Sequence, residues 1–297
     1  MPVTIGDGTS FARVAPELGG MVTAFWSRRG PDHLHWLWPI PDEQLALTAT
    51  PKGGMFVMAP FSNRIDGAHL RFRGREHALE PHPEAAPAAM HGYANRRPWR
   101  VIEQKGSSLT LVLEGADPAW PWRLRMVQRL AIEAGALRAE LEVTSLDQEP
   151  QPIGLGFHPF LTRSGGNRLS IGAGTRWTTE PSTRPIAAKS TGTAVPLDLA
   201  LDPLAYDRYL GDWTGNAQII FPSLGAALDL RTDAAALPYV LLFCPEGRPI
   251  FCIEPVSHLT GAFELPEPRA VAQGMRVLAP GQSLRATLEL APILTLE

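Results

Sequence analysis

Apolar and polar residues alternate over many short segments of this sequence, and helix-length amphipathic stretches are almost absent. The alternation is plainest in the segments 109–113, 123–127 and 137–143. A period of two places every second side chain on one face of a β-strand, so these segments are typical of strands with one buried face. Turn residues separate them at intervals typical of antiparallel meanders.

Strand candidates number well over a dozen, which favours an all-β fold built as a large antiparallel β-sandwich. A β-propeller would show self-similarity at blade length, and the sequence has none. We expect a single domain over residues 1–297. Segment 178–203 is rich in Pro, Thr, Ser and Ala, and we expect a wrapped surface loop there rather than a linker. Residues 202–212 are expected to form a short turn or helix.

Charge and cysteine content exclude several classes of protein. The net charge of −3 gives no basic field for nucleic acid or an anionic membrane. The first residues lack the basic and apolar regions of a secretory signal, and the longest apolar runs are too short to span a bilayer. Only Cys244 and Cys252 occur, so we expect reduced thiols and a cytoplasmic protein. Because the two cysteines flank a turn, a disulfide between them is kept as an alternative.

Two residues that precede proline, His158 and Glu254, each follow an apolar run. A residue before proline is pushed toward extended backbone. Proline cannot donate to a ladder, so we expect strand pairing to stop there and His158 to lie at a strand end. We expect the two residues to face each other across a binding site.

Other polar residues also lie near the ends of apolar strands: Asn63, Arg64, His91 and Asp207. Three of them have an ordinary structural alternative: His91 as a hydrogen-bonded core histidine, Arg64 as a turn residue and Asp207 as a capping aspartate. Glu254 shares a strand face with Cys252 and is harder to dismiss, because a buried carboxylate needs a partner or a function. The sequence contains no phosphate-binding loop, nucleophile elbow, Cys-x-x-Cys or His-Glu-x-x-His. No close-spaced pair stands out among the eight histidines, so no metal is expected.

Taken together, these motifs resemble the aldose 1-epimerases (galactose mutarotases). The order of the matching motifs along the chain is Asn63-Arg64-Ile65, His91-Gly92 with Trp99, His158-Pro159-Phe160, and Glu254-Pro255 with His258. Weaker matches to motifs of the same family are Trp120-Pro121, Val143-Thr144-Ser145 and Pro280-Gly281-Gln282-Ser283. The resemblance covers almost the whole chain.

The resemblance implies a galactose mutarotase-like supersandwich and a sugar substrate. In that family the histidine of His-Pro is the general acid and the glutamate of Glu-Pro is the general base, here His158 and Glu254. The residues matching the sugar-binding positions are Asn63, Arg64, His91 and Asp207, with Asp202 or Asp212 as alternative matches for the aspartate. The family uses no metal or organic cofactor. We further expect a monomer or weak homodimer.

The residue types suit the chemistry that the resemblance implies. Opening a cyclic hemiacetal needs one proton taken from the anomeric hydroxyl and one given to the ring oxygen. A carboxylate and an imidazolium on opposite sides of the ring could do this. We expect an anionic neighbour to raise the pKa of His158.

Departures from the family pattern leave alternatives open. The usual His-Pro-Tyr-Phe is here His158-Pro159-Phe160-Leu161, so one tyrosine hydroxyl is missing. Residues 91–99, with Arg96 and Arg97, look more like glucose-6-phosphate 1-epimerases, in which arginines meet a phosphate. The Asn-Arg-Ile motif favours an unphosphorylated aldose. A non-catalytic carbohydrate-binding protein and a glycosidase that uses Glu254 with Asp207 are further alternatives.

Overall fold

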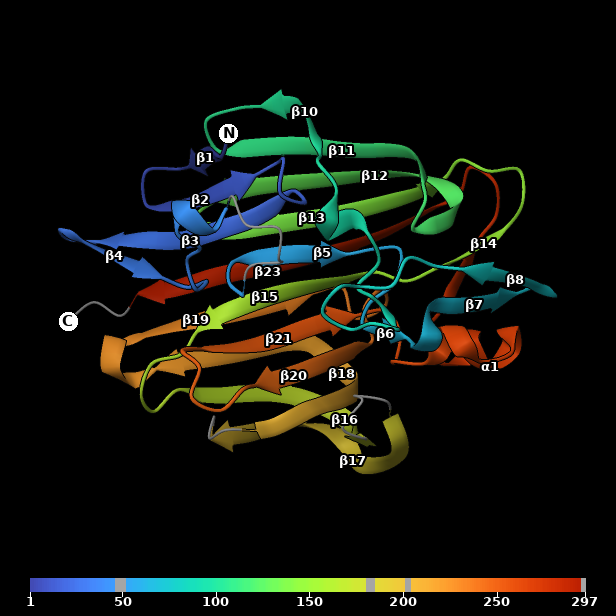
Figure 1. Cartoon of the computed structure of the whole chain (residues 1–297). Helices are drawn as coiled ribbons and strands as arrows, with labels where there is room; N and C mark the ends of the chain where they lie inside the picture. Colours follow the sequence, from blue (N-terminus) through green and yellow to red (C-terminus); the bar gives the residue numbers. More distant parts are fainter. Residues whose placement is uncertain (46–51, 180–184, 201–203, 295–297) are drawn as a thin grey trace.

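The computed structural model describes residues 1–45, 52–179, 185–200 and 204–294, and only the backbone for most of 178–208. Seventeen strands are joined by hydrogen bonds into one sheet, and the strand pairs within it are antiparallel (Figure 1). The one α-helix among the described residues is α1, Glu267–Ala272. The all-β prediction is confirmed.

One half of this sheet carries the residues singled out in the sequence. Neighbouring strands hydrogen-bond in the spatial order that follows. They are β1 (Val3–Gly6), β2 (Ser10–Ala15), β3 (Met21–Arg29), β5 (Met55–Met58), β15 (Gly156–Thr162), β21 (Ile250–Val256), β20 (Tyr239–Cys244) and β18 (Leu204–Phe221). A short strand, β4 (Asp32–His35), pairs with the end of β3.

The other half begins where the long strand β18 changes partners. Its first part pairs with β20 and its last part with β19, so β18 belongs to both halves. The order continues through β19 (Ala226–Thr232), β23 (Ser283–Leu294), β13 (Ala136–Ser145), β12 (Trp120–Glu133), β11 (Ser108–Asp117) and β10 (Arg100–Gln104). On its opposite edge β18 pairs with β16 (Arg168–Thr179), which pairs in turn with β17 (Pro185–Ala200).

The main hydrophobic core lies between the two halves. It joins buried side chains of both, for example Val22 and Phe157 from the first half with Leu124, Leu141 and Leu288 from the second. Burial of this apolar surface is the main force that holds the sandwich together.

Strands β15 and β21 are buried on both faces. Phe157 and Ile253 point into the main core, whereas Phe160, Cys252 and Val256 belong to a second apolar cluster on the opposite face. Because side chains alternate along a strand, His158 and Glu254 also lie on that second face. The second cluster therefore surrounds the candidate residues with apolar groups.

The prediction that His158 ends a strand is wrong. His158 and Pro159 lie inside β15, which pairs with β5 on one side and β21 on the other. The ladder between β15 and β21 pairs Gly156 with Val256 and then resumes only at Phe160 with Cys252. The interruption falls where the two prolines lie, so the missing N–H groups remove hydrogen bonds locally without ending either strand.

Two further expectations fail in the middle of the chain. The segment expected to be a wrapped loop contains β17, which pairs with β16, and the segment expected to form a turn or helix lies largely in β18. The alternation of apolar and polar residues is weak in both segments. Their strand form is therefore set by pairing with neighbouring strands, which local sequence does not report.

Three two-stranded sheets and several single-turn helices accompany the main sheet. The two-stranded pairs are β6 (Arg64–Ile65) with β9 (Ala89–Met90), β7 (His69–Phe72) with β8 (Arg75–Ala78), and β14 (Gln151–Ile153) with β22 (Arg276–Leu278). The 3-10 turns are η1 (Asp42–Gln44), η2 (Asp66–Ala68), η3 (Ala94–Arg96), η4 (Pro222–Leu224) and η5 (Ala262–Glu264). The expected helical turn at residues 42–50 is thus present at its start, and residues 46–50 lie outside the described part.

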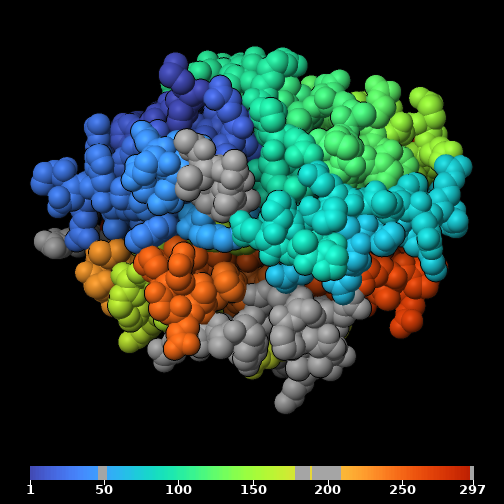
Figure 2. Space-filling model, viewed as in Figure 1, coloured from blue at the N-terminus to red at the C-terminus, as the bar shows by residue number. Residues whose placement is uncertain are grey.

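The N-terminal and C-terminal parts of the chain meet on one face of the molecule. Figure 2 shows the blue N-terminal residues packed directly against orange residues of the C-terminal third. Strand pairing explains this contact, because β5 lies beside β15 and β15 beside β21. The predicted site residues, which are far apart in sequence, are brought together by the same pairing.

Candidate active site

His158 and Glu254 are direct cross-strand neighbours. The register that pairs Gly156 with Val256 and Phe160 with Cys252 sets His158 opposite Glu254. Their Nε2 and Oε1 atoms lie 3.4 Å apart, and the side chains are only 10% and 3% exposed. The two pre-proline residues do face each other, but as adjacent groups on one face rather than from opposite sides of a ring-sized gap.

Aromatic rings hold the His158 imidazole in place. Phe160, on the same strand, stacks on it with ring centroids 4.5 Å apart. The ring of Phe56, on the neighbouring strand β5, has its centroid 4.7 Å away. His91 meets the His158 ring edge-on at 5.4 Å. Sequence reasoning named Phe160 only as part of the His-Pro motif and assigned no role to Phe56. The contact with Phe160 could have been found, because Phe160 is two residues from His158 on the same strand face, whereas Phe56 reaches His158 only through the pairing of β5 with β15.

Burial decides the protonation state of His158. Burial, together with the positive charge of Lys52, lowers its pKa to about 3. The expectation that an anionic neighbour raises this pKa is wrong, because the loss of water around the ring outweighs the carboxylate. The imidazole is therefore neutral at neutral pH in the unliganded protein.

His91 and Asn63 are tied to each other by two reciprocal hydrogen bonds. The backbone N–H of Asn63 donates to His91 Nδ1 at 3.1 Å, and the backbone N–H of His91 donates to the Asn63 backbone carbonyl at 2.9 Å. Because Nδ1 is an acceptor, the neutral ring carries its proton on Nε2. Both residues have a positive φ, 57° for His91 and 54° for Asn63. Strained non-glycine backbone of this kind is concentrated at functional sites.

Gly92 fixes the loop that carries His91. It has a φ of 66°, and a Cβ at this position would overlap the carbonyl of Ala59. The same carbonyl accepts the Tyr93 N–H at 3.0 Å, which docks the loop on the end of β5. Arg64 lies on β6 opposite Met90, and its charge is near enough to lower the pKa of His91 further after burial has done so. The structure thus brings Asn63, Arg64 and His91 to the edge of the His158–Glu254 pair.

The three candidate aspartates differ in what the structure describes. Asp207 lies on the backbone of β18, which pairs with β20, but its side chain lies outside the described part. Asp202 is also outside it. Asp212 is exposed, has a φ of 49° and accepts a hydrogen bond from the Thr175 hydroxyl. The assignment of Asp207 stays a prediction.

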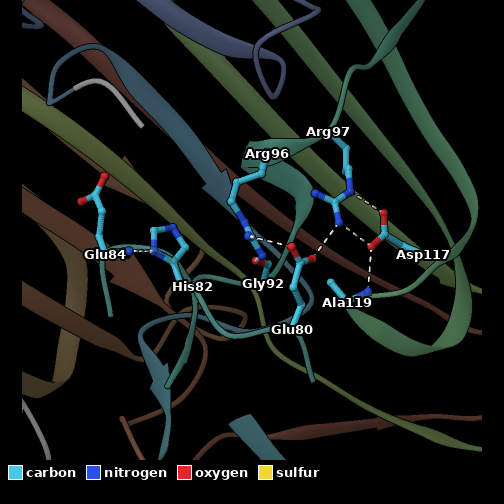
Figure 3. Close-up of polar contacts among 8 residues, drawn as sticks. All are labelled: Glu80, His82, Glu84, Gly92, Arg96, Arg97, Asp117 and Ala119. Atoms are coloured by element: carbon cyan, nitrogen blue, oxygen red, sulfur yellow. Dashed lines mark hydrogen bonds and ion pairs between the residues drawn. The ribbon is translucent and has the colours of Figure 1, made fainter. Parts of the chain in front are cut away.

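Arg96 and Arg97, which sequence reasoning left as phosphate ligands, are engaged within the protein (Figure 3). Arg97 donates to both oxygens of Asp117, at 2.7 and 3.0 Å, and to Glu80 at 2.9 Å. Arg96 lies 3.6 Å from Glu80 and donates to the Gly92 carbonyl at 3.3 Å. These bonds hold the loop beside His91. The carboxylates of Glu80 and Asp117 also neutralise the positive charge that would otherwise attract a phosphate.

His258 is a structural residue. Its Nε2 accepts the backbone N–H of Ser62 at 3.0 Å, and its Nδ1 donates to the Leu259 carbonyl at 2.9 Å. Burial lowers its pKa to about 4. A Cβ at Gly154 would overlap this ring, which explains why glycine stands there. His258 therefore ties β21 to the segment that leads into Asn63.

Cys252 lies on the same strand face as Glu254. Its Sγ and the ligand atoms of His158 and Glu254 all lie within 4.8 Å of one another. Cys252 and Cys244 are both buried and are not joined to each other. No helix among the described residues is long and apolar enough to cross a membrane.

Comparison with known proteins agrees with this arrangement. The family model of aldose 1-epimerases matches residues 1–291. YphB from Escherichia coli K12, an uncharacterised protein, is 26% identical over 97% of both chains. The crystal structure of b2544 from the same organism superposes with a TM-score of 0.83, at 25% identity over 99% of both chains. The crystal structure of a galactose mutarotase-like protein from Clostridium acetobutylicum superposes with a TM-score of 0.84, at 16% identity over 99% of this chain and 95% of the other. The chain belongs to the aldose 1-epimerase family.

Proposed function

We propose that this protein is a mutarotase that interconverts the α and β anomers of a free hexose, with His158 as the acid and Glu254 as the base. The observation that carries the proposal is the buried pair itself, an imidazole nitrogen 3.4 Å from a carboxylate oxygen. Membership of the aldose 1-epimerase family, matched over residues 1–291, supports the reaction class.

The closeness of the two groups suits the reaction. The anomeric hydroxyl and the ring oxygen are bonded to the same carbon atom, so an acid and a base that serve them must themselves be neighbours. Glu254 takes the proton of the anomeric hydroxyl while His158 gives a proton to the ring oxygen, and the bond between the anomeric carbon and the ring oxygen breaks. Rotation of the open aldehyde and the reverse proton transfers give the other anomer. Each group contributes on the order of 10²–10⁴-fold.

The pair works as a unit with one proton. A neutral imidazole is a poor acid, and burial together with the charge of Lys52 lowers the pKa of His158 to about 3. An ionised Glu254 beside it favours the imidazolium, so the charged form of His158 depends on its partner. Such coupled groups titrate as a pair rather than singly. Asn63, Arg64 and His91 at the edge of the pair would orient the sugar hydroxyls, and Asp207 is proposed for the same role.

Two alternatives are disfavoured by particular contacts. A hexose 6-phosphate would need unengaged arginines, whereas Arg97 is neutralised by Asp117 and Glu80. A glycosidase normally opposes two carboxylic residues, whereas the group 3.4 Å from Glu254 is an imidazole. A protein that only binds sugar would have no need of an acid–base pair.

The test is the rate at which fresh α-D-glucose, α-D-galactose and glucose 6-phosphate reach anomeric equilibrium, followed by polarimetry or NMR. We expect acceleration for at least one free hexose, and a kcat/KM for glucose 6-phosphate at least tenfold lower than for that hexose. No acceleration with any of the three would disprove the mutarotase. A preference for the phosphate ester would replace it with the phosphorylated alternative.

A further inference from the structure

Three different metal-binding atoms meet at the centre of β15 and β21. They are the imidazole of His158, the carboxylate of Glu254 and the thiol of Cys252, all buried and within 4.8 Å of one another. Strand geometry explains the meeting. Cys252 and Glu254 are two residues apart on β21 and share a face, and His158 stands opposite Glu254 on β15.

The spacing is near that of a tetrahedral zinc site. Zinc binds nitrogen and oxygen at about 2.0–2.2 Å and sulfur at about 2.3 Å, which places its ligand atoms roughly 3.3–3.6 Å from one another. The Nε2–Oε1 distance of 3.4 Å between His158 and Glu254 already meets this requirement. All three ligand atoms lie within 4.8 Å of one another, so a tetrahedral ion would require them to close by no more than roughly 1–1.5 Å.

We propose that these three residues form a site for Zn²⁺ or another thiophilic divalent cation, and that the bound ion blocks the acid–base pair. Three protein ligands and an open fourth position are the usual composition of an accessible zinc site. A nitrogen, oxygen and sulfur set selects soft or borderline ions over Mg²⁺ and Ca²⁺. Binding replaces the thiol proton of Cys252, which is released to solvent.

Charge balance makes such a complex compatible with burial. The thiolate and the carboxylate together carry two negative charges, which neutralise the divalent ion, and the imidazole coordinates in its neutral form. The buried complex therefore has no net charge to desolvate.

The site lacks one feature of a structural zinc centre. A ligating histidine usually donates its second N–H to a carboxylate or carbonyl, and losing that partner weakens metal binding by about 10–100-fold. Nδ1 of His158 is buried and has no hydrogen-bond partner from any other described residue. We therefore infer reversible inhibition that a chelator removes, rather than a permanently bound ion.

The first experiment does not depend on catalysis. The purified full-length protein is titrated with Co²⁺, which reports a thiolate ligand through an intense near-ultraviolet charge-transfer band. We expect one band in the wild type and in Cys244→Ser, whose thiol is also buried but lies on β20 outside the cluster. We expect no band in Cys252→Ser and a weaker one in His158→Gln, which keeps the thiol. Absence of the band in the wild type, or its loss in Cys244→Ser with retention in Cys252→Ser, would overturn the site.

The second experiment measures inhibition and uses the proposed mutarotase activity as its readout. Zn²⁺ should slow the wild type and Cys244→Ser reversibly, with recovery after EDTA. With inhibition measured relative to its own metal-free rate, Cys252→Ser should need at least about tenfold more Zn²⁺ for the same fractional inhibition. Equal inhibition of all three proteins would overturn the blocking role. If no mutarotation is found, the cobalt titration still decides the metal site, so the two proposals fail separately.

Discussion

Two buried histidines of this fold, His158 and His258, differ in how completely they are bonded. His258 uses both ring nitrogens, one toward the Ser62 N–H and one toward the Leu259 carbonyl. His158 turns Nε2 toward Glu254 and leaves Nδ1 without a partner from any other described residue. Both are almost fully buried, at 2% and 7% exposure.

The comparison shows which property separates a structural histidine from a functional one. Burial lowers the pKa of both residues, to about 4 for His258 and about 3 for His158. Neither burial nor pKa distinguishes them. Hydrogen bonding does, because a ring that is bonded at both nitrogens cannot exchange a proton with a ligand without losing a bond to the protein. A ring with one nitrogen not bonded in this way can exchange a proton with a ligand and keep its other contacts.

The largest expected effect is on catalysis. In His158→Gln and in Glu254→Gln we expect kcat/KM for mutarotation to fall by about 10²–10⁴-fold, because each removes one proton-transfer group. The free energy of unfolding should change little, since both replacements keep much of the side-chain volume. Polarimetry measures the rate and urea unfolding the stability. Wild-type rates in either variant would remove the proposed roles.

The reverse pattern is expected for His258→Ala. The substitution opens a cavity beside Phe263 and leaves the Ser62 N–H buried without its acceptor. We expect the free energy of unfolding to fall by about 2–4 kcal/mol, measured in urea. The folded fraction should keep kcat within a few-fold of wild type. A loss of kcat comparable to that of His158→Gln, with stability unchanged, would reverse the assignment of the two histidines.

The pH dependence of stability should reveal the buried neutral rings. An unfolded histidine takes up a proton below pH 6.5, whereas His258 in the folded protein stays neutral until about pH 4. The unfolded state then binds more protons, so the stability is fully present above pH 6.5 and is lost as pH falls. This amounts to about 2 kcal/mol between pH 6.5 and 5 for each such ring.

His258→Gln tests this linkage. It should be less stable than wild type at pH 7 but lose about 2 kcal/mol less between pH 6.5 and 5, in urea unfolding at the two pH values. His158→Gln should flatten the same slope, and the exposed His33 offers a matched control through His33→Gln. If His258→Gln and His33→Gln show the same slope as wild type, His258 is not held neutral by the fold.

The contact between Gly154 and the His258 ring shapes this region of the fold. Gly154→Ala places a methyl group against the His258 ring, and we expect a loss of about 1–3 kcal/mol from overpacking. In the double variant Gly154→Ala/His258→Ala the ring is gone, so the two losses should not add. Gly165→Ala is a suitable control, because a Cβ there meets open space. Additive losses would mean that the ring is not the obstacle.

Much of this molecule could be predicted from the sequence. The alternation in segments such as 137–143 predicted the strands of the second sheet half, because a strand with one buried face has a period of two. Cys252 and Glu254 were predicted to share a face for the same reason. The ordered motifs at Asn63, His91, His158 and Glu254 identified the family and hence the fold.

What could not be predicted depends on contacts between distant segments. Pro159 was expected to end its strand, but β15 lies between two partners that hold it in place. The pKa of His158 was expected to rise, but its direction depends on burial among Phe56, Phe160 and their neighbours, which no local pattern reports. The pairing of Arg97 with Asp117 and Glu80 likewise joins residues far apart in sequence.

The position of β15 and β21 inside the sheet has a consequence for how the substrate range could change. The acid and the base are held by cross-strand register, so their spacing is a property of the scaffold and is insensitive to the loops. Asn63, Arg64 and His91 instead lie in or directly beside the short strand pair of β6 with β9. New sugar preferences can therefore arise by exchanging loop residues while the reactive pair stays untouched, which separates the evolution of selectivity from that of chemistry.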